Sequence, residues 1–188
     1  MKTVARQAFW NLPNSLTMAR IAVIPLVMVL MVFPGRFMCQ VAMWLFIAAC
    51  ITDIVDGFLA RRLGLTSTVG AFLDPLADKL LVMAVMVMLI PLDRIPAWMV
   101  VLLLSREITI TALRGIAVSE GIVIAAGKLG KYKTAFQDTA LGFLIFHHAW
   151  KGIDAHSVGI VLMWFALGYS LVSGWTYLRG FLRATVTA

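Results

Sequence analysis

The feature that most constrains this chain is a series of six apolar segments of 16 to 24 residues, separated by short polar breaks. A helix needs about 20 mostly apolar residues to cross a bilayer. The pattern therefore predicts an all-α, polytopic membrane protein with six transmembrane helices. A short interfacial amphipathic helix is expected before them, over residues 2–10. The six predicted spans cover residues 16–33, 39–59, 69–90, 95–118, 135–150 and 158–178.

Composition excludes the main alternatives to a membrane protein. Of the 188 residues, 62% are apolar and only 13% are charged, against about 25% charged in a typical soluble domain. These polar groups are too few to cover the surface of a soluble chain of this size. A disordered chain is excluded as well, because disordered chains are much poorer in apolar residues. Cys39 and Cys50 lie in apolar segments and form no disulfide framework. We expect one membrane domain over residues 1–188.

The basic residues predict the orientation of the chain. With six spans, thirteen of the sixteen Lys and Arg residues fall on the side that holds both termini, and the other side has only the loop cations Arg36, Arg94 and Lys151. This asymmetry places both termini in the cytoplasm and the protein in the inner (cytoplasmic) membrane. Four of the cations, Arg20, Lys79, Arg106 and Arg114, lie within apolar segments. Charges at that depth are costly and mark a functional cavity.

Four carboxylates occupy two consecutive predicted helices within 26 residues: Asp53, Asp56, Asp74 and Asp78. The spacings of three and four place each pair on one helix face, and a short connection makes the two helices antiparallel neighbours. Four unpaired carboxylates at one depth would repel each other and carry a large desolvation cost. One interpretation is structural pairing with cations such as Arg61, Lys79 and Arg106. The other is a site for two Mg²⁺ or Mn²⁺ ions, which prefer carboxylate oxygens.

The wider pattern favours the metal site. It reads Asp53-x-x-Asp56-Gly57-x-x-Ala60-Arg61, then eight residues, then Gly70-x-x-x-Asp74-x-x-x-Asp78. This stretch resembles the signature of the CDP-alcohol phosphotransferase family at every fixed position. The resemblance implies a two-metal site held by the four Asp residues, a CDP-linked lipid donor and the release of CMP.

The resemblance also assigns roles to individual residues. Asp78, the last Asp of the pattern, is expected to act as general base on the acceptor hydroxyl as well as to bind metal. The small residues Gly57 and Ala60 would let the cytidine lie against the helix, and Arg61 suits a phosphate. Donor binding is assigned to Gly57, Ala60, Arg61, Gly70, Asn14 and Thr17.

A second group of cations predicts the acceptor. The segments Arg106-Glu107-Ile108 through Arg114 and Gly130-Lys131-x-Lys133-Thr134 resemble the phosphatidylglycerophosphate synthase branch of the family. That branch uses CDP-diacylglycerol as donor and sn-glycerol 3-phosphate as acceptor. The cation surplus suits a phosphate, which we assign to Arg106, Arg114, Lys131 and Lys133. The structural alternatives are pairing of the arginines with Glu107, Glu120 or Asp138, and anchoring of the lysines at lipid headgroups.

Other functions stay open at this point. The same family could use another acceptor, an inositol phosphate or a phosphatidyl lipid. Clustered intramembrane Asp residues also occur in cation transporters, and a non-catalytic assembly protein leaves the Asp pattern unexplained. The expected partners are the two substrates and the lipid bilayer, with no nucleic acid. Ala166, Ser170 and Gly174 form a close-packing face that suits either a homodimer or packing within the chain.

Overall fold

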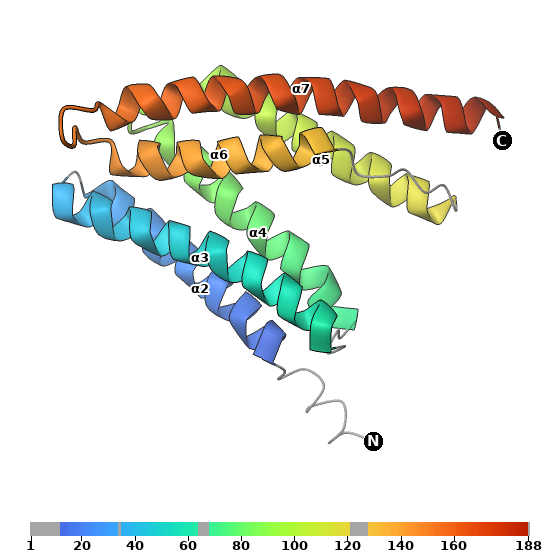
Figure 1. Cartoon of the computed structure of the whole chain (residues 1–188), viewed down its shortest axis with the longest axis horizontal. Coiled ribbons are helices and arrows are strands. Elements are labelled where there is room, and N and C mark those ends of the chain that lie inside the picture. The colour runs from blue at the N-terminus through green and yellow to red at the C-terminus, as the bar shows by residue number, and fades with distance from the viewer. Residues whose placement is uncertain (1–11, 34, 64–67, 121–127, 188) are drawn as a thin grey trace.

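The computed structural model describes residues 12–33, 35–63, 68–120 and 128–187, and these residues form six helices (Figure 1). The side chains of residues 12–14, 16, 54, 56–63, 68–75, 128 and 185–187 lie outside the described part. The predicted interfacial helix over residues 2–10 also falls outside it. The helices are α2 (Leu12–Val32), α3 (Arg36–Leu63), α4 (Thr68–Leu89), α5 (Ala97–Ser119), α6 (Lys128–Phe146) and α7 (Ala155–Thr187).

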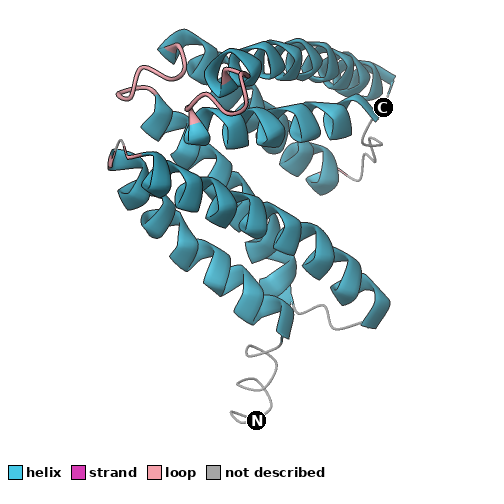
Figure 2. Cartoon of the chain, turned by 60° about the vertical axis from the view of Figure 1, so that its left-hand side comes forward, coloured by secondary structure: helices cyan, strands magenta, loops and turns pink. Residues whose placement is uncertain are grey.

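The helices pack as two layers joined by α4. α2 and α3 lie side by side, α6 and α7 form a second close pair, and α5 packs along α7 (Figure 1). α4 packs on α2 and also reaches α5 and α6, while α3 packs against α6. The turns after α4 and α6 lie at the same end of the molecule (Figure 2). The described residues are all helical apart from their turns, as predicted, and their six helices correspond to the six predicted apolar segments.

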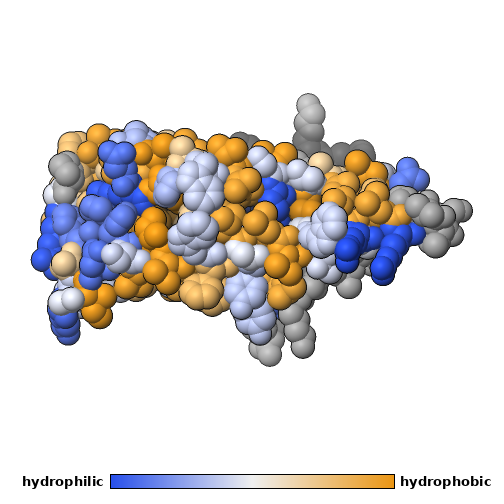
Figure 3. Space-filling view, turned by 90° about the horizontal axis from the view of Figure 1, so that it is seen from above, coloured by the Kyte–Doolittle hydropathy of each residue, from blue (hydrophilic) through white to orange (hydrophobic). Residues whose placement is uncertain are grey.

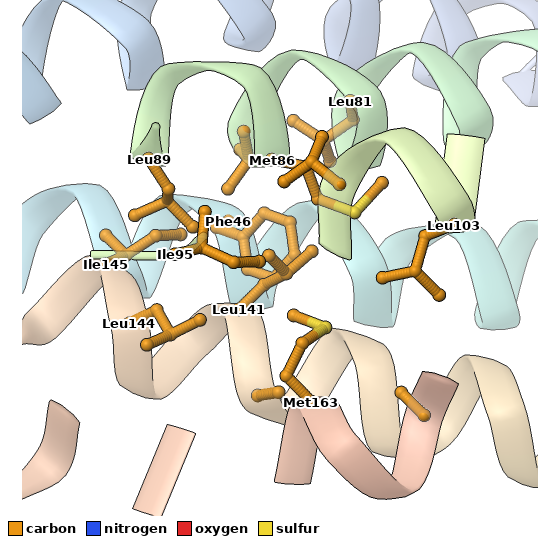
Figure 4. Packing of buried hydrophobic residues seen from close by; sticks show 14 of the residues in the cluster. Phe46, Leu81, Met86, Leu89, Ile95, Leu103, Leu141, Leu144, Ile145 and Met163 are labelled. Carbon is orange, nitrogen blue, oxygen red and sulfur yellow. The ribbon is translucent and has the colours of Figure 1, made fainter. Parts of the chain in front are cut away.

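The core lies where the two layers meet. Phe46 of α3, Leu81 of α4 and Leu103 of α5 are almost fully buried, and they converge on α6 and α7 (Figure 4). Small residues allow the closest approach. A side chain at Gly159 would come within 2.8 Å of Leu144, so only glycine lets α7 pack this closely on α6.

Apolar side chains occupy much of the described surface. Two helices are long and apolar enough to cross a bilayer, through the segments Arg36–Asp53 and Ala155–Ala184, and Thr17–Val32 is a shorter apolar helix. The face in Figure 3 is hydrophobic across its middle and hydrophilic at its left end. Trp164, Phe165 and Val172 of α7 are more than half exposed, and soluble monomers rarely expose large apolar patches. Six complete spans remain a prediction.

The end opposite the predicted Asp cluster is closed by polar caps. Asp154 accepts hydrogen bonds from the backbone N–H groups of His156 and Ser157, each at 3.2 Å, and so caps the start of α7. Arg94 is 5% exposed, and its guanidinium donates to the carbonyl of Ile145 at 2.8 Å. The predicted loop cation Arg94 is therefore a buried cap for the last turn of α6.

Replacing Arg94 with alanine is expected to destabilise the protein by about 1.5–3 kcal/mol, because α6 loses a charged donor to its terminal carbonyls. The measurement is the midpoint of thermal unfolding in detergent. Lys131→Ala is the control, since Lys131 is an exposed cation near the other end of α6. Equal midpoints for the two variants would contradict the capping role.

Candidate active site

Two of the four predicted Asp side chains are described, and they lie close together. Asp53 is ten residues before the end of α3, and Asp78 is ten residues after the start of α4. At about 1.5 Å per residue, both lie roughly 15 Å from the ends where α3 and α4 approach each other. Their carboxylates are near enough for mutual repulsion. The predicted juxtaposition of the two helices at this depth is confirmed for this pair.

An arginine from α2 offsets part of this negative charge. Arg20 is 3% exposed, and its Nη1 lies 2.7 Å from Oδ1 of Asp53. The structural pairing considered for the Asp residues therefore exists for Asp53, with Arg20 as the partner. Thr17, one of the predicted donor residues, is buried one turn before Arg20 on the same helix.

For the other predicted metal and donor residues, the structure describes the backbone but not the side chains. Asp56 follows Asp53 by one turn in α3, and Asp74 precedes Asp78 by one turn in α4. Their side chains lie outside the described residues, and their roles stay predictions. The same holds for the donor residues Gly57, Ala60, Arg61, Gly70 and Asn14.

A polar cavity of about 180 Å³ opens beside Asp78, between α4, α5 and α6. Its polar wall contains two cations, Lys79 and Lys133, and it has far more room than the 10–15 Å³ that one water needs. Lys79, which the sequence marked only as an intramembrane charge, donates to the hydroxyl of Thr111 at 2.6 Å. The polar lining residues are Asp78, Lys79, Glu107, Lys133, Thr134, Gln137 and Asp138.

Glu107 joins the cations of three helices. Its Oε2 accepts a hydrogen bond from Nζ of Lys133 at 2.7 Å and one from Nη1 of Arg106 at 3.2 Å. Its Oε1 lies 3.7 Å from Nζ of Lys79. The three cations and Glu107 together carry a formal charge of +2, and the carboxylates of Asp78 and Asp138 line the same cavity. Lys79 and Lys133, the two lysines of the cavity wall, are the cations placed to bind an anion such as a phosphate.

The four predicted acceptor cations take different positions. Lys133 is 7% exposed and lines the cavity, whereas Lys131 is exposed two residues earlier on α6. Arg114 lies over the ring of Tyr177, with 5.8 Å from its guanidinium carbon to the ring centroid. The structure thus brings Lys133 into the cavity beside Asp78 but neither Lys131 nor Arg114.

Arg106 lies beside the cavity and is bound to α7. Its Nε donates to the carbonyl of Ser170 at 3.0 Å, and its Nη2 donates to the hydroxyl of Ser173 at 2.7 Å. A side chain at Gly174 would come within 3.2 Å of Arg106. The face formed by Ala166, Ser170 and Gly174 is therefore buried within the chain, and it makes room for this arginine.

An apolar groove of about 410 Å³ lies between α3 and α6, next to the polar cavity. Met43, Ile47 and Phe143 contribute to its apolar wall. Asp138 lines both the groove and the polar cavity, and it is near enough to Asp78 for mutual repulsion. The polar cavity and the apolar groove therefore adjoin each other at Asp138, and together they give the site a charged part and an apolar part.

The donor chemistry of these residues fits a hard divalent cation. Asp53, Asp78 and Asp138 offer carboxylate oxygens, the ligands that Mg²⁺ and Mn²⁺ prefer. Within the described part of the chain, no three His, Cys, Asp or Glu side chains are grouped closely enough to hold a metal ion. The predicted ligand set also needs Asp56 and Asp74, whose side chains are outside that part.

Three residues of the cavity were not predicted as site residues. Glu107 and Asp138 were considered only as ion-pair partners of the arginines, and Gln137 was not considered. The spacing of the polar residues on α6 could have indicated two of these residues, Gln137 and Asp138. Lys133 and Gln137 are four residues apart, as are Thr134 and Asp138, so all four lie on one side of α6.

Comparison with known proteins shows the family of this chain. Residues 10–172 match the sequence profile of the CDP-alcohol phosphatidyltransferase family. The chain is 42% identical to the CDP-diacylglycerol–glycerol-3-phosphate 3-phosphatidyltransferase of Bacillus subtilis, covering 89% of this chain and 93% of that protein. It is 35% identical to the protein of the same name from Rickettsia typhi, over 90% and 96%. It is also 35% identical to the cardiolipin synthase (CMP-forming) of Oryza sativa, over 92% of this chain and 58% of that protein.

The site combines half-buried carboxylates, a cavity wall with two lysines and an adjoining apolar groove. The chain belongs to the CDP-alcohol phosphatidyltransferase family. It is therefore a transferase, and the resemblance identified from its Asp pattern is confirmed. The cation transporter and the non-catalytic assembly protein are set aside by the same finding.

Proposed function

We propose that this enzyme transfers the phosphatidyl group of CDP-diacylglycerol to sn-glycerol 3-phosphate, giving phosphatidylglycerophosphate and CMP. The observation that carries the proposal is the polar cavity. It holds a buried lysine, Lys133, near Asp78 and shares Asp138 with an apolar groove. The names of the Bacillus subtilis and Rickettsia typhi relatives support the same reaction.

The reaction needs a proton acceptor and a way to neutralise the donor. The acceptor hydroxyl oxygen forms a bond to the phosphorus that carries diacylglycerol. The bond from that phosphorus to the bridging oxygen breaks, and CMP leaves with the bridging oxygen. Asp78 takes the hydroxyl proton, and its place in the cavity wall beside Lys79 puts it next to any bound acceptor.

We assign two divalent cations, Mg²⁺ or Mn²⁺, to Asp53, Asp56, Asp74 and Asp78. When bound, they would neutralise the donor diphosphate and the departing phosphate of CMP. The donor set supports this assignment through its hard oxygen ligands. The ion pair with Arg20 holds the Asp53 carboxylate in place.

The two halves of the site match the two substrates. The groove between α3 and α6 suits an acyl chain of the donor, because its wall is mostly apolar and the polar cavity lies beside it. The cavity suits the acceptor phosphate, because the Glu107 cluster of Lys79, Arg106, Lys133 and Glu107 places two lysines, Lys79 and Lys133, in its wall. We place the site and both termini on the cytoplasmic side from the distribution of basic residues. Homodimerisation stays a prediction.

A phosphatidyl lipid is the second candidate acceptor, favoured by the similarity to the cardiolipin synthase of Oryza sativa. The names of the Bacillus subtilis and Rickettsia typhi relatives favour the phosphate monoester, glycerol 3-phosphate, over this candidate.

The deciding experiment gives the purified protein CDP-diacylglycerol with each acceptor in turn. The acceptors are sn-glycerol 3-phosphate, glycerol, inositol phosphate and phosphatidylglycerol, and the readouts are CMP release and the mass of the lipid product. We expect phosphatidylglycerophosphate to be the main product and glycerol to be a poor acceptor. Faster turnover with phosphatidylglycerol would transfer the assignment to the second candidate.

Lys133 and Lys131 provide a matched test of the phosphate site, since they lie two residues apart on α6. Lys133→Met is expected to raise the KM for glycerol 3-phosphate roughly 10- to 100-fold, because a buried charged contact to the phosphate is lost. Lys131→Met should change it by less than about threefold, since Lys131 is exposed. Steady-state kinetics with saturating donor checks both variants. A larger effect at Lys131 would place the phosphate outside the cavity.

A further inference from the structure

One buried amide in the cavity wall, Gln137, has no role in the chemistry described so far. Its side chain is 2% exposed and lines the cavity. Its Nε2 donates to the sulfur of Met86 at 3.5 Å, and sulfur is a weak acceptor. Its Oε1 has no hydrogen-bond partner among the described residues. Buried polar atoms without partners are uncommon, and in a cavity they point to a ligand or to water.

The position of Gln137 relates it to the acceptor. It lies one turn after Lys133 on the same face of α6, with Cα atoms about 6 Å apart along the helix axis. Lys133 is held by Glu107 at 2.7 Å, so the charged part of the cavity is fixed on that side. The next residue, Asp138, also lines the cavity, and its Oδ1 is likewise without a partner in the described part of the chain. Along α6, the cavity wall therefore presents the cation Lys133 first, and one turn later the hydrogen-bond acceptors of Gln137 and Asp138.

We propose that Gln137 recognises the secondary hydroxyl of the acceptor, so that the terminal hydroxyl is the one presented to Asp78. The inference rests on the proposed function, since glycerol 3-phosphate carries a phosphate, a secondary hydroxyl and a terminal hydroxyl in that order. With the phosphate at Lys133, the secondary hydroxyl donates to Oε1 of Gln137. The side-chain amide has a carbonyl oxygen that accepts a hydrogen bond and an NH2 group that donates one. A hydroxyl can pair with either group, so rotating the amide by 180° keeps the recognition.

This arrangement makes the enzyme selective for monophosphates that carry two adjacent hydroxyls. A buried amide rejects an acceptor that lacks its partner hydroxyl, because the amide is then left without a hydrogen bond. Charge alone gives no such selectivity, since the Glu107 cluster contacts only the phosphate. Gln137 would thus be a specificity residue separate from the phosphate site.

The test compares glycerol 3-phosphate with propane-1,3-diol monophosphate, which has the same phosphate and terminal hydroxyl but no secondary hydroxyl. For the unmodified enzyme we expect kcat/KM to favour glycerol 3-phosphate roughly 10- to 100-fold. In Gln137→Met, a side chain of similar length without an amide, the preference should fall below about threefold. The main change should be a loss of activity toward glycerol 3-phosphate, with an unchanged KM for the donor.

Gln40→Met is the matched control, since Gln40 is exposed on α3, and it should keep the full preference. A Gln137→Met enzyme that keeps the preference overturns the inference. So does an unmodified enzyme that uses both acceptors equally, a measurement that needs no variant. An unmodified enzyme that uses neither acceptor overturns the proposed function instead. Gln137→Leu repeats the test with a second side chain that lacks the amide.

Discussion

Asp78→Asn is expected to lower turnover at least about 100-fold and up to about 10⁴-fold, the range that a positioned general base contributes. Asp78 lines the polar cavity with Lys79 and Lys133, and asparagine keeps its size but accepts no proton. CMP release at saturating donor and acceptor measures the loss. Changing the pH of the assay should not restore turnover in Asp78→Asn, since asparagine has no titratable group.

Two comparisons make this result specific. Asp93→Asn is the control, because Asp93 is in the turn after α4 with a φ of 54°, a conformation that asparagine also adopts. It should leave turnover unchanged. Asp53→Asn should weaken both CDP-diacylglycerol binding and turnover, since the sequence assigns Asp53 to metal binding only. If Asp78→Asn reduces donor binding as strongly as Asp53→Asn, Asp78 is principally a ligand and the base is another group.

Removal of divalent cations is expected to abolish turnover, and Mg²⁺ or Mn²⁺ should restore it. Metal ions contribute several kcal/mol by stabilising charge on phosphoryl oxygens, which corresponds to a loss of at least about 100-fold. The expectation follows from the carboxylates. Asp53 and Asp78 lie near enough to repel each other, and Arg20 contacts only Asp53 among the ion pairs described.

The measurement is CMP release after treatment with EDTA and gel filtration, followed by addition of each ion. Zn²⁺ is the comparison ion, since it prefers nitrogen and sulfur ligands and should restore less activity. Thermal unfolding with and without Mg²⁺ gives a second readout, because an ion that binds the folded state raises the midpoint. Full turnover after complete metal removal would rule out the metal site and leave the Asp residues with structural pairing alone.

Much of the fold was predictable because apolar length and polar breaks are local properties of the chain. The six described helices overlap the six predicted segments, and α3 extends the predicted segment at both ends, to Arg36 and Leu63. The Asp pattern was predictable for a similar reason. Residues three and four apart share a helix face in any helix, so the pairing of Asp53 with Asp56, and of Asp74 with Asp78, needs no tertiary information.

The partners of the charged residues were not predictable from spacing. Arg94 was counted as a loop cation, and the structure buries it against the last turn of α6. Arg106 was assigned to the acceptor phosphate, and the structure binds two of its nitrogens to Ser170 and Ser173 of α7. Both contacts join residues more than 45 positions apart, so they depend on how the helices pack.

The sequence by itself determined the class of protein, the number of helices and the Asp pattern of the family, because these follow from composition and from spacing within one helix. Only the tertiary structure decided which cations share a cavity. Lys131 and Lys133 are two positions apart on a helix, about 200° around its axis, and packing against α4 and α5 buries one and leaves the other exposed. The same packing brings Glu107 of α5 to Lys133 of α6, and so it builds the cavity that we assign to the acceptor phosphate from residues that no local pattern connects.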